Sequence, residues 1–115
     1  MSYRSSIEAI VLSWDGVTAH PHRFGGREYR YFSREIGHIH GSEMVDVPLP
    51  VKVRDEVIAA GLAAPHHLLP DTGWVSIYLH GEEDVQHATQ VLERSYQLAL
   101  EQALGRAARA AANPT

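Results

Sequence analysis

The sequence predicts an α+β two-layer sandwich, in which helices cover one side of a mostly antiparallel five-stranded sheet. Three observations lead to this prediction. Apolar residues recur at helical spacing near both ends of the chain, whereas they alternate with polar residues in five other segments. The connections between the first four of these segments are too short for parallel crossovers. The predicted order is therefore helix, four strands, helix, strand and helix, or αββββαβα.

The first predicted element is a short helix that ends at Asp15-Gly16. Ser5 and Glu8 have the spacing of a capping box, in which each side chain accepts a hydrogen bond from a backbone N–H group near the start of the helix. The apolar residues that follow at helical spacing are Ile7, Ile10, Val11 and Trp14. This helix therefore has one apolar side to bury.

Four short strands are predicted next, because the period of the apolar pattern changes to two after the first helix. They cover residues 17–24, 26–32, 34–40 and 43–49. Turn-forming residues separate them at Gly25-Gly26, near Ser33-Arg34 and at Gly41-Ser42. Connections of this length favour an antiparallel meander.

A second short helix is predicted after Pro50, and Gly61 ends it. Residues 62–73 contain two prolines and a glycine and are predicted to form a structured loop. In the strand that follows, residues 74–80, alternate side chains face opposite sides. The core-facing set is Val75, Ile77 and Leu79, and the other set is Trp74, Ser76, Tyr78 and His80.

The last predicted helix is the longest element and begins in the acidic segment 81–85, because acidic side chains favour a helix N-terminus. Its buried stripe consists of Val85, Ala88, Leu92, Ser95, Tyr96, Ala99 and Ala103. Beyond Gly105, the segment 106–115 has little apolar surface to bury, so we expect it to fray. A single domain is therefore predicted over residues 1–105, followed by a frayed tail.

Composition narrows the classes of function. The net charge of -4 comes from 14 acidic and 10 basic residues spread along the chain, so no nucleic-acid partner is expected. No apolar run reaches the roughly 20 residues that cross a bilayer, and we expect a soluble, cytoplasmic protein without a membrane partner. Cysteine is absent, which excludes thiolate chemistry and restricts any metal to nitrogen and oxygen ligands.

Histidine is the unusual residue of this composition, since the chain has eight. His38 and His40 share one face of a predicted strand, and His20 and His22 share one face of another. If these strands lie together with matching faces, up to four imidazoles converge, and the 62–73 loop brings two more histidines over the sheet. Imidazole suits zinc, copper, iron and nickel, so such a cluster indicates a ligand site.

The turn that follows His40 decides which residues face these histidines. A two-residue loop pairs His38 with Val45, whereas a three-residue loop pairs His38 with Asp46, whose carboxylate would orient an imidazole. Both registers fit the sequence. We prefer the longer loop, because it leaves Val45 on the apolar face and collects His38, His40 and Asp46 on the polar one.

Simpler interpretations and other chemistries stand beside this one. A histidine on a strand is often a half-exposed structural residue, and the aromatic side chains of the sheet are typical of packing.

Only two residues separate His40 from Glu43, unlike the cupin metal motif, and the predicted strands are too few for a jelly roll. There is no GxSxG motif, and Gly25-Gly26 precedes a strand rather than a phosphate-binding helix.

Four segments in order, HPHRFGGREYRYFSREIGHIHG, VDVPLP, APHHLLPDTGWVSIYL and VLERSYQLA, resemble a family of small bacterial luciferase-domain proteins. This family shares a domain with the luciferases of bioluminescent fungi, and the resemblance spans residues 17–98. It implies oxygenation of a hydroxylated, pyrone-like aromatic substrate without a bound organic cofactor. The positions that match the most distinctive motifs are His38, His40, His66, His67, Asp71 and Trp74.

The leading hypothesis is a pocket, lined by histidines, that binds a small aromatic or enolic molecule. In an oxygenase-like reaction, an imidazole would remove a phenolic or enolic proton, and the resulting anion would react with oxygen. The candidate catalytic residues are His38, His40 and His66, and the candidate substrate-binding residues are His67, Asp71, Trp74 and Tyr31. The hypothesis requires no cofactor, but a divalent metal held by His38, His40 and Asp46 is an alternative.

The rival hypothesis is a non-catalytic interaction module. Its histidines would be surface residues, and the aromatic sheet face would bind another protein or a second copy of the chain, because exposed apolar patches usually mark contacts. A homodimer that buries Trp74 and Tyr78 would favour this hypothesis, whereas a monomer with a deep pocket would favour the first.

Overall fold

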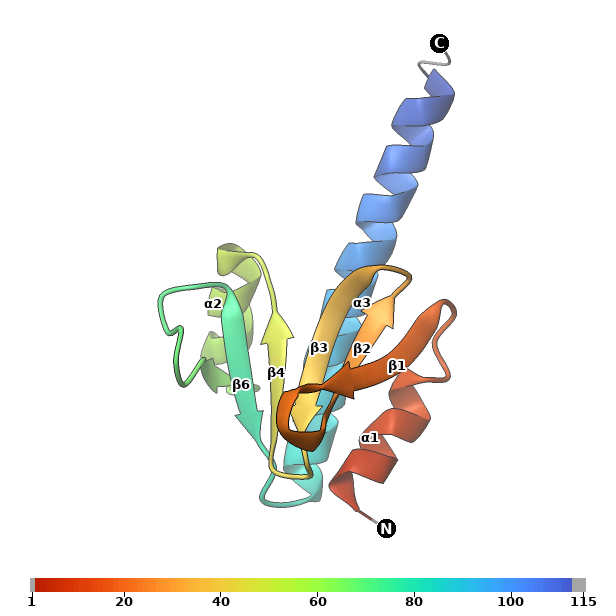
Figure 1. The fold of residues 1–115 in the computed structure, drawn as a ribbon. Helices are drawn as coiled ribbons and strands as arrows, with labels where there is room; N and C mark the ends of the chain where they lie inside the picture. Colours follow the sequence, from red (N-terminus) through yellow and green to blue (C-terminus); the bar gives the residue numbers. More distant parts are fainter. Residues whose placement is uncertain (1, 113–115) are drawn as a thin grey trace.

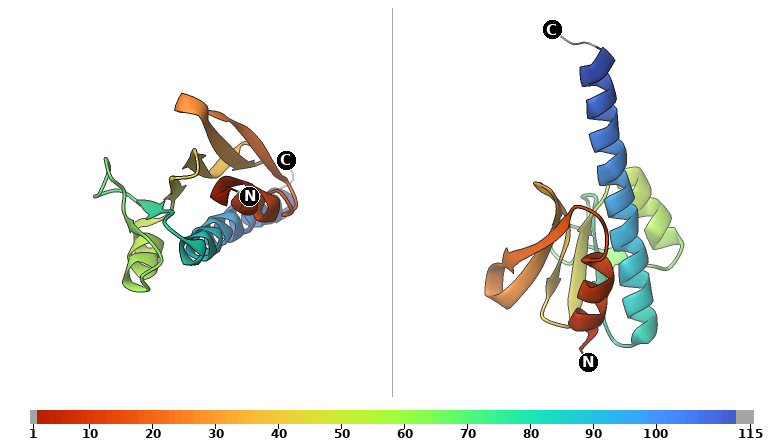
Figure 2. Two further views of the ribbon diagram at one scale, coloured as in Figure 1. Left: turned by 90° about the horizontal axis from the view of Figure 1, so that it is seen from below. Right: turned by 90° about the vertical axis from the view of Figure 1, so that its right-hand side faces the viewer.

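The structure, a computed structural model, describes residues 2–112. Its centre is an antiparallel six-stranded sheet with the order β1-β2-β3-β4-β6-β5, and all three α-helices lie on one side of it (Figures 1 and 2). The strands are β1 (Val17–His22), β2 (Gly26–Tyr31), β3 (Arg34–His40), β4 (Met44–Pro48), β5 (Ala64–Pro65) and β6 (Trp74–Tyr78). The helices are α1 (Tyr3–Val11), α2 (Val51–Ala59) and α3 (Glu82–Ala112), with a short 3-10 turn, η1 (Arg23–Gly25). The predicted α+β sandwich is confirmed.

The sixth strand is a correction to the predicted five. Ala64–Pro65 pairs with β6 at the edge of the sheet, within the segment that was predicted to be a loop. A two-residue strand has no alternation to read in a sequence, and proline is tolerated in a sheet only at such an edge. The short strand positions the loop that follows it, which carries His66 and His67.

Helix α1 begins earlier than predicted and ends earlier too. The Ser2 side chain accepts a hydrogen bond from the backbone N–H of Ser5, so Ser2 and not Ser5 is the N-cap, and the helix ends at Val11. Glu8 is free of the predicted capping box, and its carboxylate instead accepts hydrogen bonds from Arg27 and Tyr29. The helix is therefore tied to β2 by polar contacts, and its Ile7 side chain is fully buried.

The face of the sheet that the helices cover is apolar. Ile39, Val45, Val47 and Val75 are fully buried there, as the alternation of the three central strands predicts. Leu92 of α3 lies directly over Gly37 of β3, since a Cβ atom at Gly37 would approach Leu92 Cδ2 to 2.5 Å. Glycine at this position thus allows α3 to pack closely on the centre of the sheet.

Helix α3 runs past the sheet and continues to Ala112, as its extension beyond the other elements shows (Figure 1). We expected fraying from residue 106, but residues 106–112 are helical although their side chains are exposed. Alanine and arginine are among the strongest helix formers, and they extend the helix without burial. The predicted tail residues 113–115 lie outside the described part of the chain. No helix among residues 2–112 has the length and apolar character needed to span a membrane.

Candidate functional site

The uncovered face of the sheet carries a cavity of about 380 Å³. Strands β3 and β4 supply its floor, and the hairpin between them has the longer of the two loops considered above. His38 pairs with Asp46 and His40 with Met44, so the preferred register is confirmed. The residues that line the cavity are His22, Arg23, Phe24, Glu35, His38, His40, Asp46, His66, His67, Leu68 and Trp74.

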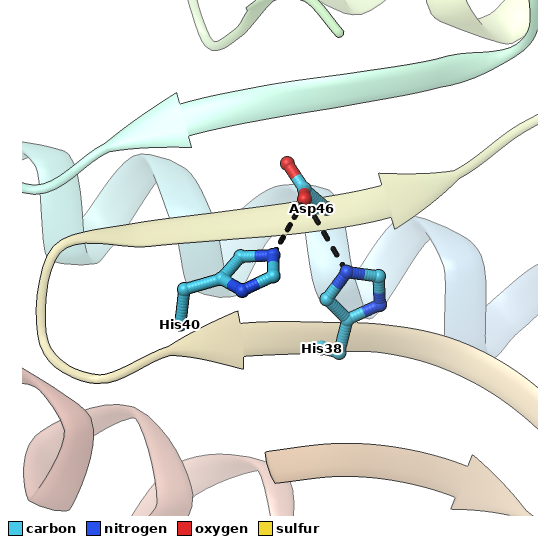
Figure 3. Close-up of side chains that lie close together, drawn as sticks. All are labelled: His38, His40 and Asp46. Carbon is cyan, nitrogen blue, oxygen red and sulfur yellow. Dashed lines mark hydrogen bonds and ion pairs between the residues drawn. The ribbon is translucent and has the colours of Figure 1, made fainter. Parts of the chain in front are cut away.

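Asp46 is the centre of this site. Its side chain is 1% exposed, and its Oδ2 atom lies 2.9 Å from His40 Nε2 and 3.3 Å from His38 Nε2 (Figure 3). The Ser76 hydroxyl donates a hydrogen bond of 2.7 Å to the other oxygen, Oδ1. Burial alone would raise the pKa of Asp46, but the hydrogen bonds from His38, Ser76 and His40 hold it well below its ordinary value. Asp46 is therefore an ionised carboxylate at the base of the cavity.

His38 lies between two carboxylates. Its Nδ1 is 2.6 Å from Glu35 Oε2, and its Nε2 faces Asp46. Burial opposes the charged imidazolium, but the hydrogen bonds and charges of Asp46 and Glu35 prevail and raise the pKa of His38 to about 9. Near neutral pH His38 therefore carries a positive charge that balances part of the charge of these two carboxylates.

His66 is fixed in one neutral form. Its Nδ1 accepts hydrogen bonds from the backbone N–H groups of Leu68 and Leu69, both at 3.1 Å. Because Nδ1 accepts, the ring proton is on Nε2, which lies 3.4 Å from Asp46 Oδ2. Burial, acting against the attraction of Asp46, lowers the pKa of His66 and favours this neutral ring. His66 is thus a proton donor toward the carboxylate and also holds its own loop in place.

His67 and Trp74 form the wall of the cavity beside His66. His67 Nδ1 lies 3.3 Å from the Ser76 hydroxyl, and the His67 ring stacks on His66 with centroids 4.2 Å apart. The Trp74 ring centroid is 5.3 Å from that of His38 and 6.0 Å from that of His66. Residues 66 to 74 therefore provide one flat aromatic surface and one half-exposed imidazole.

Two residues that the sequence analysis did not assign to the site, His22 and Glu35, also contact His38. The His22 ring stacks on His38 at 4.0 Å between centroids, and Glu35 holds His38 Nδ1. His20 and His22 share one face of β1, so the alternation of this strand indicated that either could converge with His38. The structure brings only His22 to His38, because the His20 ring contacts the Thr18 hydroxyl. Glu35, three residues before His38, comes within reach because β3 is irregular where it pairs with Tyr29 and Arg30.

Two of the predicted substrate-binding residues lie elsewhere. Asp71 is exposed in the loop before β6 and does not line the cavity. Tyr31 lines a different cavity beside α3, where its ring contacts Phe32 and Tyr96 edge-on. The structure thus brings together His38, His40, His66, His67, Trp74 and Asp46, but not Asp71 or Tyr31.

The ligand atoms of His38, His40 and Asp46 all lie within 4.8 Å of one another, so these residues could hold a metal ion. The same criterion is met by Asp46, His66 and His67. Two imidazoles and one carboxylate are a donor set of the kind that binds divalent transition metals and leaves coordination positions open.

The floor of the cavity falls within a segment that a known family model matches. The model, described as Luciferase domain, matches residues 33–95, which is more than half of the chain. This segment contains both strands of the floor and the whole loop with His66 and His67. No curated protein and no solved structure gives a significant match. The chain belongs to the luciferase-domain family.

Proposed function

We propose that the cavity binds a small aromatic or enolic molecule with a free hydroxyl group and supports an oxygenase-like reaction of that molecule. The observation that carries the proposal is the buried Asp46 carboxylate, surrounded by imidazoles from β3 and from the 66–67 loop at the floor of one cavity. Polar groups that converge in a concave site are the usual mark of ligand binding.

The dimensions and walls of the cavity fit such a ligand. A volume of about 380 Å³ lies within the range that small-molecule sites occupy. The Trp74 ring offers a flat apolar surface, and the half-exposed rings of His40 and His67 offer hydrogen-bonding nitrogens. At the rim, the exposed side chains of Phe24 and Leu68 add apolar surface. A planar ring with one or more hydroxyl groups matches this mixture of aromatic wall and polar floor.

The reaction class rests on the family. The resemblance to fungal luciferases implies oxygenation of a hydroxylated, pyrone-like substrate. In this reaction dioxygen adds to an electron-rich ring carbon, so that the organic molecule is oxidised and dioxygen is reduced. No further reductant is needed when both oxygen atoms stay on the product. The histidines of the cavity would hold the substrate hydroxyl and fix the ring for attack.

The interaction-module alternative receives less support. Trp74 and Tyr78 were expected to share an open apolar platform, but Trp74 is a wall of the cavity. Ser76, which lies between them on β6, is fully buried beneath the site and bonded to Asp46. A homodimer through this face remains a proposal that light scattering would test.

Tryptophan fluorescence tests the proposal. The chain has two tryptophans, so a Trp14→Phe variant, which keeps the stacking on Tyr96, makes Trp74 the reporter of the cavity. Titration with catechol should quench this emission saturably. Veratrole, the dimethyl ether of catechol, should bind at least about 10-fold more weakly, because the polar floor is left without a hydroxyl partner.

The histidine variants decide whether the binding occurs in the cavity. In the Trp14→Phe background, His40→Ala and His67→Ala should each weaken catechol binding, whereas His80→Ala, at an exposed position outside the cavity, should not. Equal binding of catechol and veratrole, or unchanged binding in the His40 and His67 variants, would reject the proposal.

A further inference from the structure

We propose that His38 Nε2, His40 Nε2 and Asp46 Oδ2 bind one divalent transition-metal ion on the floor of the cavity. This metal site goes beyond the small-molecule binding proposed above and does not depend on it. His38 and His40 alternate on β3 and so point to the same side, and the three-residue turn brings Asp46 opposite them on β4 (Figure 3).

The separations between the ligand atoms suit a shared metal. Two bonds of about 2.1 Å that meet at a metal place their donor atoms about 3.0 Å apart at a right angle and about 3.4 Å apart at a tetrahedral angle. The observed separations from Asp46 Oδ2 are 2.9 Å to His40 Nε2 and 3.3 Å to His38 Nε2. The two imidazole nitrogens lie within 4.8 Å of each other, so one ion can replace the direct contacts once both Nε2 atoms have released their protons.

The surrounding groups hold the ligands as outer-sphere partners do in metal proteins. Glu35 accepts a hydrogen bond from His38 Nδ1 at 2.6 Å, which leaves Nε2 as the nitrogen that faces the metal. The Ser76 hydroxyl donates to Asp46 Oδ1 at 2.7 Å, which leaves Oδ2 for the metal. Both orientations are set by residues outside the ligand set, so the site is preorganised.

The alternative set of Asp46, His66 and His67 fits less well. Like His38 and His40, His66 must give up its Nε2 proton to bind a metal, but its Nδ1 already accepts two backbone N–H groups. Ligation through Nε2 would move that proton to Nδ1 and break both hydrogen bonds of the loop. His66 is therefore assigned as an outer-sphere donor to Asp46, 3.4 Å from Oδ2, rather than as a ligand.

The donor set also limits the metal. Two imidazoles and one carboxylate on one side of an ion favour iron, cobalt, nickel or zinc over magnesium and calcium, which prefer all-oxygen sites. The remaining positions face the cavity, because all three ligands are among its lining residues. A ligand oxygen and a small second molecule therefore have room on the open side of the metal.

Cobalt(II) is the probe of choice, because it takes the same ligands as iron and zinc and its visible absorption reports coordination. Protein purified without a histidine tag should bind one Co²⁺ per chain, measured by absorption and by elemental analysis after gel filtration. His40→Ala and Asp46→Asn should each lower the affinity at least about 100-fold, because the first removes a ligand and the second removes the negative charge of one. The control His80→Ala should leave both affinity and stoichiometry unchanged.

The His66→Asn variant separates a ligand from an outer-sphere residue. The asparagine oxygen can still accept the backbone N–H groups of the loop, but the ring N–H that faces Asp46 is lost. We expect one Co²⁺ per chain with an affinity lowered about 10- to 100-fold. Near-ultraviolet circular dichroism establishes that each variant is folded.

Three results would overturn the proposal. The first is no saturable Co²⁺ binding at concentrations up to about 1 mM. The second is wild-type affinity in folded His40→Ala or Asp46→Asn protein. The third is complete loss of binding in folded His66→Asn protein, which would place His66 among the ligands. No organic ligand is present in this assay, so its failure is distinguishable from failure of the small-molecule proposal.

Discussion

The two faces of the central strands differ in composition, although both bury side chains at their centre. On the helix side, Ile39, Val45 and Val75 are fully buried among apolar neighbours. On the other side, Asp46 and Ser76 come from the same strands, and they are 1% and 0% exposed. One face has the composition of a hydrophobic core, whereas the other buries a carboxylate beneath imidazoles.

Stability alone does not explain the polar face. Removing a carboxylate from water costs several kcal/mol, and well-packed apolar residues often replace a buried ion pair without loss of stability. The apolar face shows that this chain has the residues to make such a core. We infer that the helix-covered face supplies most of the folding free energy, whereas the polar face is arranged for ligands. The following predictions test this division.

The largest effect is expected on the apolar face. Leu92→Ala removes a fully buried side chain that lies against Gly37, and it should destabilise the protein by roughly 3 kcal/mol through lost burial and a cavity. Urea unfolding followed by circular dichroism measures this change. Leu104→Ala, at an exposed position of the same helix, is the control and should stay within about 0.5 kcal/mol of the wild type. Similar effects of both substitutions would contradict the view that the helix stabilises the fold through this contact.

A smaller effect is expected for a charge on the helix side. The Arg27 guanidinium, helped by the Tyr29 hydroxyl and opposed by burial, lowers the pKa of Glu8. Glu8→Gln should therefore cost about 1 kcal/mol near neutral pH. Because the folded-state pKa lies below the unfolded value of 4.5, this contribution is present above pH 4.5 and is lost as the pH falls through the lower, folded-state pKa. Urea unfolding over a pH series should show the two proteins converging in acid, and a constant difference would disprove the linkage.

A still smaller effect on stability is expected on the polar face. The His40 side chain is 34% exposed, so water can replace its contact with Asp46 in His40→Ala. The free energy of unfolding of the metal-free protein should fall by no more than about 1 kcal/mol, although the same substitution removes a proposed metal ligand. Thermal unfolding without Co²⁺ measures the change in stability, and thermal unfolding with Co²⁺ measures the loss of stabilisation by the metal. A loss as large as that of Leu92→Ala would show that the cluster is mainly structural.

The smallest effect is expected beyond the sheet. Ala108 is exposed in the part of α3 that continues past the core. Ala108→Pro should reduce the helical circular dichroism signal but change the global free energy of unfolding by less than about 0.5 kcal/mol, because the end of the helix opens separately from the core. A clear shift of the unfolding midpoint would mean that the exposed helix belongs to the cooperative unit.

The fold could be predicted from the sequence wherever periodicity is strong. The change of period after Gly16 indicated the strands, and the alternation in β6 assigned Val75 and Ile77 to the core. The misplaced boundaries have local causes, since Ser2 and Ser5 can both cap a helix and exposed alanines give no sign of where a helix ends. Strand β5 has only two residues, which is too short to show an alternation of apolar and polar side chains.

The part of the site that could be predicted consists of residues whose relative positions follow from their spacing in one strand, hairpin or loop. The pairing of His38 with Asp46 followed from one choice of turn, and His66 and His67 followed from a loop rich in proline. The sequence does not distinguish His22 from His20, because the choice depends on contacts made only in the folded sheet, where His20 bonds to Thr18 and His22 stacks on His38. It also gives no proton position for His66, which depends on how the loop folds back on its ring.

Anomalous diffraction from crystals of the Co²⁺-loaded protein tests the central claim most directly, because it locates the ion and the surrounding rings together. We predict one strong peak per chain, about 2.0 to 2.2 Å from His38 Nε2, His40 Nε2 and Asp46 Oδ2, with His66 Nδ1 still bonded to its loop. A peak ligated by His66 Nε2, or peaks only at surface histidines such as His80, would contradict the assignment of the polar face as a metal-binding centre.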